Sequence, residues 1–594
     1  MLLTHTYTPE DVKALERAQL PELCREVRQA ILTESAAQGG HVAPNLSVVE
    51  LSVALHRVFD SPTDKLVFDV SHQTYTHKLL TGRTRAFIDP AHFGEVSGFS
   101  SPAESEHDLF AMGHTSTSVS LACGLAKARD LAGETYNVVA VIGDGSLSGG
   151  LAFEGLNNAA ELASNLVVII NDNDQSIAEN HGGLYRNLAE LRASNGTCPN
   201  NFFTALGLDY RYLEDGNDVL ALTDMLTELR GCDHPVVLHI HSVKGLGYAP
   251  AEADPEGWHH VGPFDIATGV KTPVPRACTG SNDTYAEITG SYLLDRMHKD
   301  RRVVGISAAT PYIMGFTPER RRAAGAQFVD VGIAEEHAVT YACALATAGS
   351  VPVFGVYGTF LQRAFDELWH DLCLNDAPAT LLVFGCSAYG NSDQTHLGFF
   401  DISEMRSLPN MRYLAPVCRE EYLAMLDWSL AHREHPVAIR VPGTGVVSRP
   451  DLAPAVGTAD ANFDICRYKT VRRGSDIAIL ALGDFFELGE KVADLIADKT
   501  GTAPTLINPR FATEYDTVAL DALADGHRVV VTIEDGVLDG GWGEGVCRYL
   551  ANTDLRVASF GLPSAFPDRF SADKLLEESG MTIENMAEAA IELL

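Results

Sequence analysis

The sequence lacks the cysteine spacing of a disulfide framework or a zinc site. Its 11 cysteines are scattered over 594 residues, and none forms a Cys-x-x-Cys pair. This usage is typical of reduced cysteines. No apolar run approaches the length of a membrane span, and the mixed, polar first 22 residues contain no long apolar stretch. We therefore expect a cytoplasmic protein with no membrane segment.

Positive charge is also scarce. The chain has 44 lysines and arginines against 79 aspartates and glutamates, which gives a formal net charge of −35. Nucleic-acid binding needs a cationic surface, so a nucleic-acid partner is excluded. A phosphate site in this chain must be basic locally, against a repulsive overall field. We expect small-molecule substrates instead.

What is present is an alternation of β-rich runs and helical patterns, which predicts the α/β class with mostly parallel sheets. The length exceeds what one hydrophobic core supports. Two connectors rich in proline, glycine or threonine, at 268–282 and 442–462, mark boundaries. We predict three domains, at 1–270, 280–445 and 460–594. In the second, a strand at 351–356 precedes a helix at 360–374, and in the third, a strand at 476–482 precedes a helix at 487–498.

Two β-rich apolar runs in the first segment each end in a polar motif. GDGS (143–146) follows the first run and NDN (171–173) follows the second, with an alanine-rich helical segment between them. Parallel sheets bind ligands at their carboxyl edge, so Asp144 and Asn173 are predicted to lie side by side there. A carboxylate and an amide oxygen suit a Mg²⁺ ion that keeps diphosphate oxygens as ligands. The pattern is typical of thiamine-diphosphate enzymes; the alternative is an ordinary βαβ unit with polar turns.

Glu335 stands where a β-like run ends and a helix begins, in DVGIAEEH (330–337). A glutamate in a dry crevice at this junction keeps a raised pKa and can hydrogen-bond the N1′ atom of an aminopyrimidine. The alternative is a first-turn glutamate that complements the helix dipole. Glu336 is its exposed rival. The cofactor pattern upstream favours the first interpretation.

Several of the 21 histidines follow glycines or strand ends. Imidazoles at such places can hold carboxylates and hydroxyls and move protons near neutral pH. Any single one is better explained by a surface or core position than by a catalytic role, and they are convincing only as a group. The candidates are His41, His72, His114, His259 and His396.

Several long motifs of the chain resemble those of one family, the 1-deoxy-D-xylulose-5-phosphate synthases of the transketolase superfamily. The likeness runs almost end to end, and most of these motifs are absent from general transketolases. The matching stretches are GGHVAPNLSVVEL (39–51), FDVSHQTYTHKLLTGR (68–83), ESEHDLFAMGHTSTS (104–118), VIGDGSLSGGLAFEGLNNA (141–159), IINDNDQSIAEN (169–180), VKGLGYAPAEADPEGWHHVGPFD (243–265), DVGIAEEHAVT (330–340), YGTFLQRAFDE (357–367) and QTHLG (394–398).

The resemblance implies a three-domain thiamine-diphosphate-binding (transketolase-like) fold and a homodimer. It implies that pyruvate condenses with glyceraldehyde 3-phosphate, with release of CO₂, using thiamine diphosphate and Mg²⁺ and supplying isoprene biosynthesis. It also implies that the connector at 180–210, shorter here than usual, is a surface loop.

Site residues follow from the same resemblance, position by position. Metal ligands would be Asp144, Asn173 and the Gln175 carbonyl. Cofactor contacts would come from His72, Gly113, His114, Thr115, Gly145, Ser146, Asn173, Lys244, Tyr248, Glu335 and Phe360. Catalytic or substrate-steering roles would fall to Glu335, His41, His72, His259, Tyr357, Arg363 and His396.

Three segments depart from the family. Its Asp-Arg-Ala-Gly segment after the strand at 381–386 is replaced by Ser-Ala-Tyr (387–389). Its Gly-Ala-Asp-Gly is here Gly-Asn-Ser-Asp (390–393), with the aspartate displaced by one residue. Its Arg-Tyr-Pro-Arg-Gly is here Arg-Val-Pro-Gly-Thr (440–444). In the family the two missing arginines hold the acceptor's phosphate. Such bonds contribute about 1.5–3 kcal/mol each, so two losses predict about two to four decades weaker phosphate recognition.

Three interpretations of function remain. The first is a pyruvate-dependent carboligase resembling the family. The second is a divergent transketolase-type enzyme that uses another sugar or an unphosphorylated aldehyde, which the absent arginines favour. The third is an inert homologue that serves as a binding subunit, which the intact Glu335, Asp144 and Asn173 disfavour.

Overall fold

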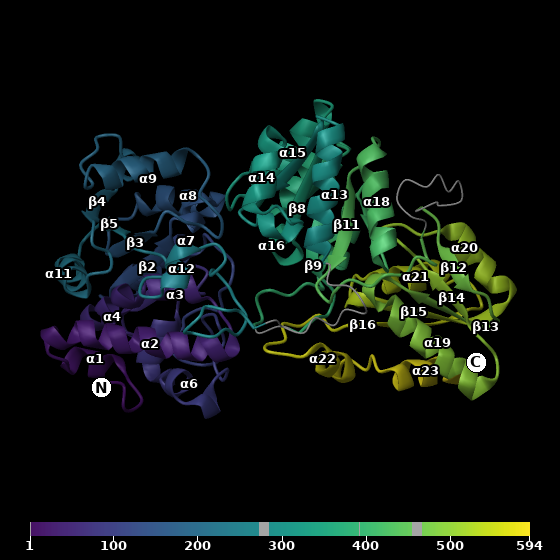
Figure 1. The fold of residues 1–594 in the computed structure, drawn as a ribbon. Helices are drawn as coiled ribbons and strands as arrows, with labels where there is room; N and C mark the ends of the chain where they lie inside the picture. The colour runs from purple at the N-terminus through teal and green to yellow at the C-terminus, as the bar shows by residue number, and fades with distance from the viewer. Residues whose placement is uncertain (1, 273–283, 391–392, 454–465) are drawn as a thin grey trace. The chain divides into compact units, whose positions relative to one another are not determined.

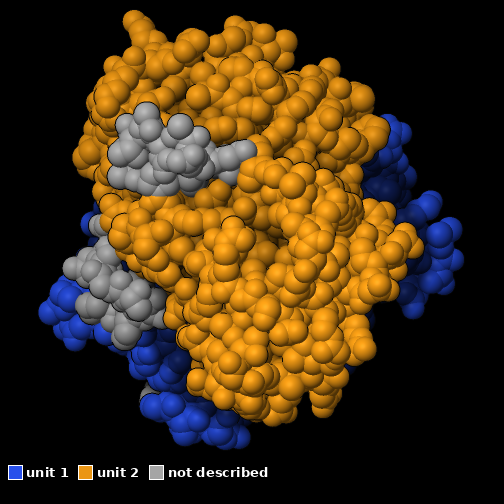
Figure 2. Space-filling model, turned by 90° about the vertical axis from the view of Figure 1, so that its right-hand side faces the viewer, with its two compact units in different colours: residues 1–275, 331–334 blue, residues 276–330, 335–594 orange. Residues whose placement is uncertain are grey.

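The computed structural model describes residues 2–272, 284–390, 393–453 and 466–594. Three sheets follow one another along the chain (Figure 1). The chain divides into two compact units (Figure 2): unit 1 is residues 1–275 with 331–334, and unit 2 is residues 276–330 with 335–594. Unit 1 contains the first sheet and unit 2 the other two. The three-domain division stays a prediction, and both predicted connectors lie partly outside the described residues.

The sheet of unit 1 has five parallel strands in the order β1-β2-β3-β5-β4. The strands are β1 (Lys65–Phe68), β2 (Val138–Gly143), β3 (Leu166–Asp172), β4 (Asp209–Leu213) and β5 (Pro235–His241). The two apolar runs read from the sequence are thus confirmed as neighbouring strands, β2 and β3.

Helices cover both faces of this sheet. The strand residues Val139 and Val141 belong to one apolar cluster, with α2, α4 and α11, while Val138 and Ile142 belong to another, with α7, α8 and α9. Burial of both faces explains why these strands read as continuous apolar runs. The helices of unit 1 are α1 (Pro9–Ala14), α2 (Leu20–Gln38), α3 (Val42–Ser47), α4 (Val49–Val58), α5 (Tyr75–Lys78), α6 (Arg85–Ile88), α7 (Ser118–Ala132), α8 (Gly150–Ala159), α9 (Gly183–Ala193), α10 (Phe202–Ala205), α11 (Val219–Leu229) and α12 (Ala249–Ala253).

The expectation of a surface loop at 180–210 is wrong, because α9 and α10 form there. Tyr185, Leu188 and Leu191 recur at helical spacing and pack into the cluster beneath α8 and β3. The Asn201 side chain accepts the backbone N–H groups of Phe203 and Thr204 and so caps α10.

The second sheet has six parallel strands in the order β10-β11-β9-β8-β6-β7. The strands are β6 (Val303–Ser307), β7 (Phe328–Asp330), β8 (Val351–Tyr357), β9 (Thr380–Cys386), β10 (Arg412–Leu414) and β11 (Val437–Pro442). Helices in this stretch are α13 (Tyr285–Lys299), α14 (Pro318–Ala324), α15 (Glu335–Thr347), α16 (Gly358–Leu361), α17 (Asp401–Arg406) and α18 (Arg419–Ala431). The predicted strand at 351–356 is confirmed as β8.

The helix predicted at 360–374 forms with irregular hydrogen bonding. After α16, a 3₁₀ turn spans Gln362–Ala364, and a π-helical segment spans Glu367–Cys373. Phe365 and Asp366 between them have helical backbone angles. Mixed turns of this kind are frequent at functional sites, and Arg363 lies within them.

The third sheet has the order β12-β14-β13-β15-β16 and is parallel except for β12, which pairs antiparallel with β14. The strands are β12 (Lys469–Arg472), β13 (Asp476–Ala481), β14 (Thr505–Asn508), β15 (His527–Val537) and β16 (Arg556–Leu562). The helices are α19 (Phe486–Thr500), α20 (Thr517–Asp521), α21 (Trp542–Leu550), α22 (Ala572–Glu578) and α23 (Ile583–Glu592). The predicted strand at 476–482 and helix at 487–498 are confirmed. Within the described part of the chain, no helix has the length and apolarity to cross a bilayer.

Candidate active site

Asp144 and Asn173 follow β2 and β3 at the same edge of the first sheet, where Gly143 pairs with Asn171. Asp144 is 1% exposed, and its Oδ2 accepts a hydrogen bond from Asn180 Nδ2 at 2.6 Å. The Oδ1 atom of Asn173 is buried and has no hydrogen-bond partner among the described residues. A buried amide oxygen without a partner calls for an explanation, and a cation is one that fits its chemistry.

The electrostatics at this edge fit a cation as well. Burial and the neighbouring Asp172 charge raise the pKa of Asp144 well above its usual range. Burial lowers the pKa of the Lys244 ammonium, whose Nζ donates to the Ser176 carbonyl. A divalent cation would reverse the penalty on Asp144 by stabilising its ionised form.

The donor set matches Mg²⁺ in particular. Within the described ranges, no three His, Cys, Asp or Glu side chains are arranged to hold a metal by themselves. The predicted ligands are instead one carboxylate, one amide oxygen and the carbonyl of Gln175, which forms an isolated bridge with Glu179. Mg²⁺ is usually held by one or two carboxylates, with water and substrate phosphates completing its octahedron. These residues therefore fit a magnesium diphosphate.

The glycine and serine loops beside this edge are tied together by Asp69. Its carboxylate accepts the backbone N–H groups of Ser116 and Ser118 at 2.8 and 2.9 Å. The Ser116 hydroxyl donates to the Ser146 carbonyl at 2.7 Å. This fixes the predicted cofactor residues Gly113, His114 and Thr115 next to the loop that carries Gly145 and Ser146.

Gly145 itself has no room for a side chain. A Cβ atom there would lie 2.8 Å from Ser176 Oγ and 3.0 Å from Ser176 Cα. Glycine is therefore required here by the packing of this turn against Ser176, and the close approach of the backbone to a ligand stays a prediction.

Three of the histidines predicted in unit 1, His41, His72 and His259, form one cluster. The ring of His41 lies 5.0 Å from that of His72 and 5.8 Å from that of His259, and the His72 and His259 rings lie 5.2 Å apart. Asn45 Nδ2 donates to the carbonyls of both His41 and His72, at 2.7 and 2.8 Å. His260 joins the cluster with its ring 4.6 Å from that of His41.

His259 is half-buried in this cluster. Burial first, and then the charges of Lys244, His72 and His260, lower its pKa well below the usual value. A neutral imidazole accepts at one nitrogen and donates at the other, and the buried Nδ1 of His259 has no hydrogen-bond partner among the described residues. The Tyr248 hydroxyl donates to the Ile266 carbonyl at 3.2 Å, and its ring packs edge-on against Trp258.

In unit 2, Glu335 begins α15 and is 4% exposed. Burial raises its pKa to about 7 despite the nearby Arg363 charge. The Oε2 atom has no hydrogen-bond partner among the described residues, and Arg363 Nη1 lies 3.9 Å away. Glu336 is only half-buried. A buried carboxyl that is half protonated near neutral pH can donate or accept a proton.

Three more predicted residues of unit 2, Tyr357, Phe360 and His396, are in contact through their rings. Phe360 lies 5.7 Å from Tyr357 and 5.5 Å from His396, edge-on in both pairs. Burial raises the pKa of Tyr357. The His396 ring is oriented by a hydrogen bond to Asp393, the aspartate that is displaced by one residue relative to the family.

The segments that depart from the family surround a carboxylate. The hydroxyls of Ser387 and Thr444 both donate to Asp484, at 2.9 Å in each case. Arg440 is buried and bound to Asp401 and Asp535. Asn391 and Ser392 lie outside the described residues.

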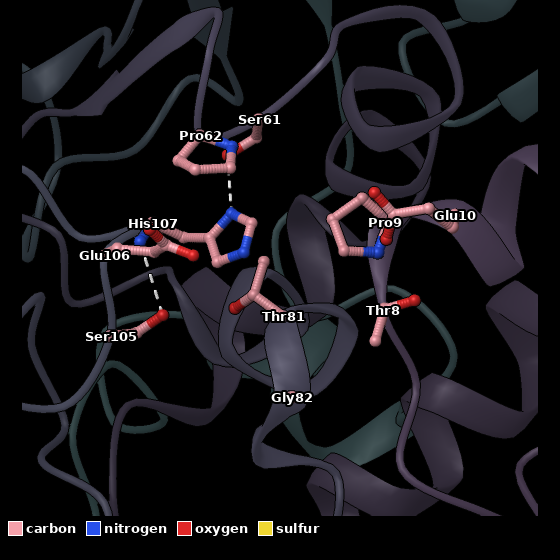
Figure 3. A pocket seen from close by; sticks show the side chains of 10 residues that line it. All are labelled: Thr8, Pro9, Glu10, Ser61, Pro62, Thr81, Gly82, Ser105, Glu106 and His107. Atoms are coloured by element: carbon pink, nitrogen blue, oxygen red, sulfur yellow. Dashed lines mark hydrogen bonds between the residues drawn. The ribbon is translucent and has the colours of Figure 1, made fainter.

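A further pocket of about 440 Å³ lies elsewhere in unit 1 (Figure 3). His107 donates to or accepts from Ser61 there, at 2.9 Å. None of its lining residues belongs to the predicted site. They are Thr8, Pro9, Glu10, Ser61, Pro62, Thr81, Gly82, Ser105, Glu106 and His107.

Sequence reasoning missed several residues that position this site. His260 had a visible signal, since it follows His259 directly. Asn180 ends the stretch 169–180, from which only Asn173 and Gln175 were predicted as site residues. Asp69 and Asn45 gave no signal, because their roles are hydrogen bonds to loops distant in sequence.

Comparison with known proteins covers the whole chain. Three family models match: 1-deoxy-D-xylulose-5-phosphate synthase at residues 3–197, the transketolase pyrimidine binding domain at 283–445 and the transketolase C-terminal domain at 467–586. A 1-deoxy-D-xylulose-5-phosphate synthase of Pelotomaculum thermopropionicum is 39% identical, over 100% of this chain and 97% of its own length. One of Symbiobacterium thermophilum is 40% identical, over 99% and 94%. One of Geobacter sulfurreducens is 38% identical, over 99% and 96%.

This likeness confirms the resemblance read from the motifs and the transketolase-like α/β fold. It does not favour the alternative of a divergent transketolase-type enzyme with another acceptor, because synthases match along the entire chain despite the absent arginines. The chain belongs to the 1-deoxy-D-xylulose-5-phosphate synthase family.

Proposed function

We propose that this protein is a thiamine-diphosphate-dependent transferase that condenses pyruvate with D-glyceraldehyde 3-phosphate and releases CO₂. The full-length likeness to synthases carries the proposal. The retained Asp144, Asn173 and Glu335, each buried or with a buried polar atom unpaired, support it. The product would supply isoprene biosynthesis.

The cofactor would be held largely by unit 1. Asp144, Asn173 and the Gln175 carbonyl would bind Mg²⁺. His72, Gly113, His114, Thr115, Gly145, Ser146, Lys244 and Tyr248 would contact the diphosphate cofactor. Among these, Tyr248 has the weakest support, because its hydroxyl is already bonded to Ile266. When bound, thiamine diphosphate stabilises the carbanion left by decarboxylation of a 2-oxo acid.

Glu335 would supply the acid–base step. With a pKa raised to about 7 by burial, its carboxyl holds a proton for part of the time at neutral pH. It can then hydrogen-bond a ring nitrogen of the aminopyrimidine, as the sequence predicts. Arg363, 3.9 Å from its Oε2, limits how far that pKa rises. Phe360 would pack near the same ring.

The histidines would position the substrates and move their protons. His259 stays neutral through burial, so it offers both a donor and an acceptor nitrogen. His41 and His72 face it within the same cluster. His396 and Tyr357 would do the same work in unit 2.

We further propose three domains at 1–270, 280–445 and 460–594, and a cytoplasmic homodimer. Phe365, Trp369 and Leu374 support the dimer, because these large apolar side chains are 39%, 45% and 63% exposed along one short stretch of unit 2. The ten cysteines within the described ranges are all free, as expected in a reducing compartment. Light scattering on a gel-filtration column tests the dimer.

The test of the reaction is CO₂ release from pyruvate by purified protein with thiamine diphosphate and Mg²⁺, with and without D-glyceraldehyde 3-phosphate. We expect the acceptor to stimulate release and 1-deoxy-D-xylulose 5-phosphate to form. Asp144→Asn is expected to abolish both, because it removes the carboxylate ligand. Absence of CO₂ release, with ketol transfer from a ketose donor instead, would overturn the proposal. Failure to bind thiamine diphosphate at all would indicate an inert homologue.

A further inference from the structure

Asp172 is the last residue of β3 and directly precedes the predicted metal ligand Asn173. Its side chain is fully buried. The Oδ1 atom accepts the backbone N–H of Asp174 at 3.1 Å. Asp174 has a φ of 59°, in the left-handed region that non-glycine residues rarely adopt. Asp172 therefore stabilises a strained turn in the segment that carries Asn173 and Gln175.

The other oxygen of Asp172 is held by a neighbouring strand. His239 of β5 lies with its Nε2 atom 2.9 Å from Asp172 Oδ2. A carboxylate only accepts, so Nε2 carries the proton of this hydrogen bond. The hydroxyl of Tyr210, on β4, lies 2.8 Å from the Nδ1 atom of His239 and completes the chain.

A cation also binds both aspartates of the turn. Arg192 of α9 forms ion pairs with Asp172 and, at 3.0 Å, with Asp174. α9 is the helix found where a loop was expected, and Arg192 links it to this turn. Residues of β5 and α9 thus bond directly to the Asp172 carboxylate, and β4 is linked to it through His239.

We propose that Asp172, His239, Tyr210 and Arg192 form a positioning network that holds residues 173–175 in the conformation that binds a divalent cation. This rests on the proposed function, since it assumes that Asn173 and Gln175 are ligands. The network would hold the unpaired Oδ1 atom of Asn173 in position to bind the cation. Partners behind a metal ligand commonly set affinity: their loss costs about 10–100-fold.

The experiment measures Mn²⁺ binding by electron paramagnetic resonance, with the full chain and saturating thiamine diphosphate. Tyr210→Phe is the decisive variant. It removes one hydroxyl, which is linked to the ligand segment only through His239 and Asp172, and it changes no charge. We expect a threefold to tenfold weaker Mn²⁺ affinity, on the order of one hydrogen bond, and an altered spectrum of the bound ion. Asp172→Asn is expected to weaken binding by about 10–100-fold.

Tyr212→Phe is the matched control. It lies on the same strand, and its hydroxyl bonds to the exposed Glu214 rather than to the network; wild-type affinity is expected. Lower stability of Tyr210→Phe with unchanged Mn²⁺ affinity and spectrum would show a structural role only and overturn the inference. Wild-type protein that binds no Mn²⁺ would overturn the metal site of the proposed function itself, which is a separate result.

Discussion

The Nδ1 atom of His396 lies 3.1 Å from Oδ1 of Asp393. The same oxygen accepts the backbone N–H groups of Thr395 and His396, at 2.7 and 3.1 Å. Burial acts to raise the pKa of Asp393, but the bonds from His396 and Thr395 outweigh it and lower that pKa. The aspartate that is displaced by one residue relative to the family therefore still anchors the histidine. It assigns the Nδ1 proton to that bond.

Asp393→Asn should weaken this anchor. A hydrogen bond to a charged group contributes about 1.5–3 kcal/mol, and about 1.4 kcal/mol is tenfold in rate. We expect kcat/KM for pyruvate to fall roughly 10- to 100-fold in steady-state assays. Asp539→Asn, at an exposed position, controls for the loss of one negative charge. Wild-type kinetics in Asp393→Asn would mean that His396 needs no anchor.

Glu335→Gln tests the acid–base role directly. Glutamine keeps the shape of the side chain but cannot take up or release the proton, so we expect kcat to fall about 10²- to 10⁴-fold. Cofactor binding, measured by calorimetry with Mg²⁺, should change far less. Glu336→Gln, on the neighbouring half-buried residue, should retain activity within about twofold, the scatter expected of a surface change. Equal loss in both variants would leave no special role for Glu335.

The fold was largely predictable because local patterns determine it. The runs at 138–142 and 166–170 are buried on both faces, and strands buried in this way have uninterrupted apolar sequences. Placing Asp144 and Asn173 at one edge needed only the parallel pairing of β2 and β3. α9 was missed because the family's surface loop was carried over, although Leu188 and Leu191 show helical spacing.

The rest of the site was not predictable, because it depends on contacts between distant segments. Asp69 bonds to Ser116 and Ser118, and Asn45 bonds to His72. No local pattern marks such pairs. The same holds for Asp484, which receives the hydroxyls of Ser387 and Thr444. Absent arginines were visible in the sequence, but the carboxylate that lies beside their positions was not.

Stability should depend on pH through Glu34. This residue of α2 is 7% exposed, and burial raises its pKa to about 7 from an ordinary value of 4.5. The folded state thus binds more protons than the unfolded state between pH 4.5 and 7, so its contribution is fully present below pH 4.5 and is lost as pH rises through 7. The loss amounts to about 3 kcal/mol.

Urea unfolding of wild type and Glu34→Gln from pH 4.5 to 8 measures this contribution. We expect the difference in unfolding free energy between the two proteins to move in favour of Glu34→Gln as pH rises, by up to about 3 kcal/mol. Other groups with a raised pKa, such as Glu335, are present in both proteins, so their contributions cancel in the difference. A difference that stays constant across this range would show that Glu34 titrates normally.

Arg440, the arginine that remains from the altered Arg-Tyr-Pro-Arg-Gly motif, is 2% exposed and fully engaged. Its Nε and Nη2 donate to Asp401 at 2.6 and 3.1 Å, and its Nη1 pairs with Asp535. A guanidinium bound to two buried carboxylates holds β11, α17 and β15 together, so its role in this chain is structural.

Arg440→Met should therefore destabilise the fold by about 3–5 kcal/mol, because it leaves two buried carboxylates without their cation. Arg449→Met is the control: Arg449 pairs with Asp451 and Glu490 while 30% of its side chain is exposed, and such pairs contribute about 0–1 kcal/mol. Urea unfolding measures both. Adding Asp535→Asn to Arg440→Met should recover part of the loss, since residues in one ionic network do not act additively. A loss in Arg440→Met no larger than in Arg449→Met would mean that the two carboxylates are neutral in the folded protein, and the ion pairs would then contribute little.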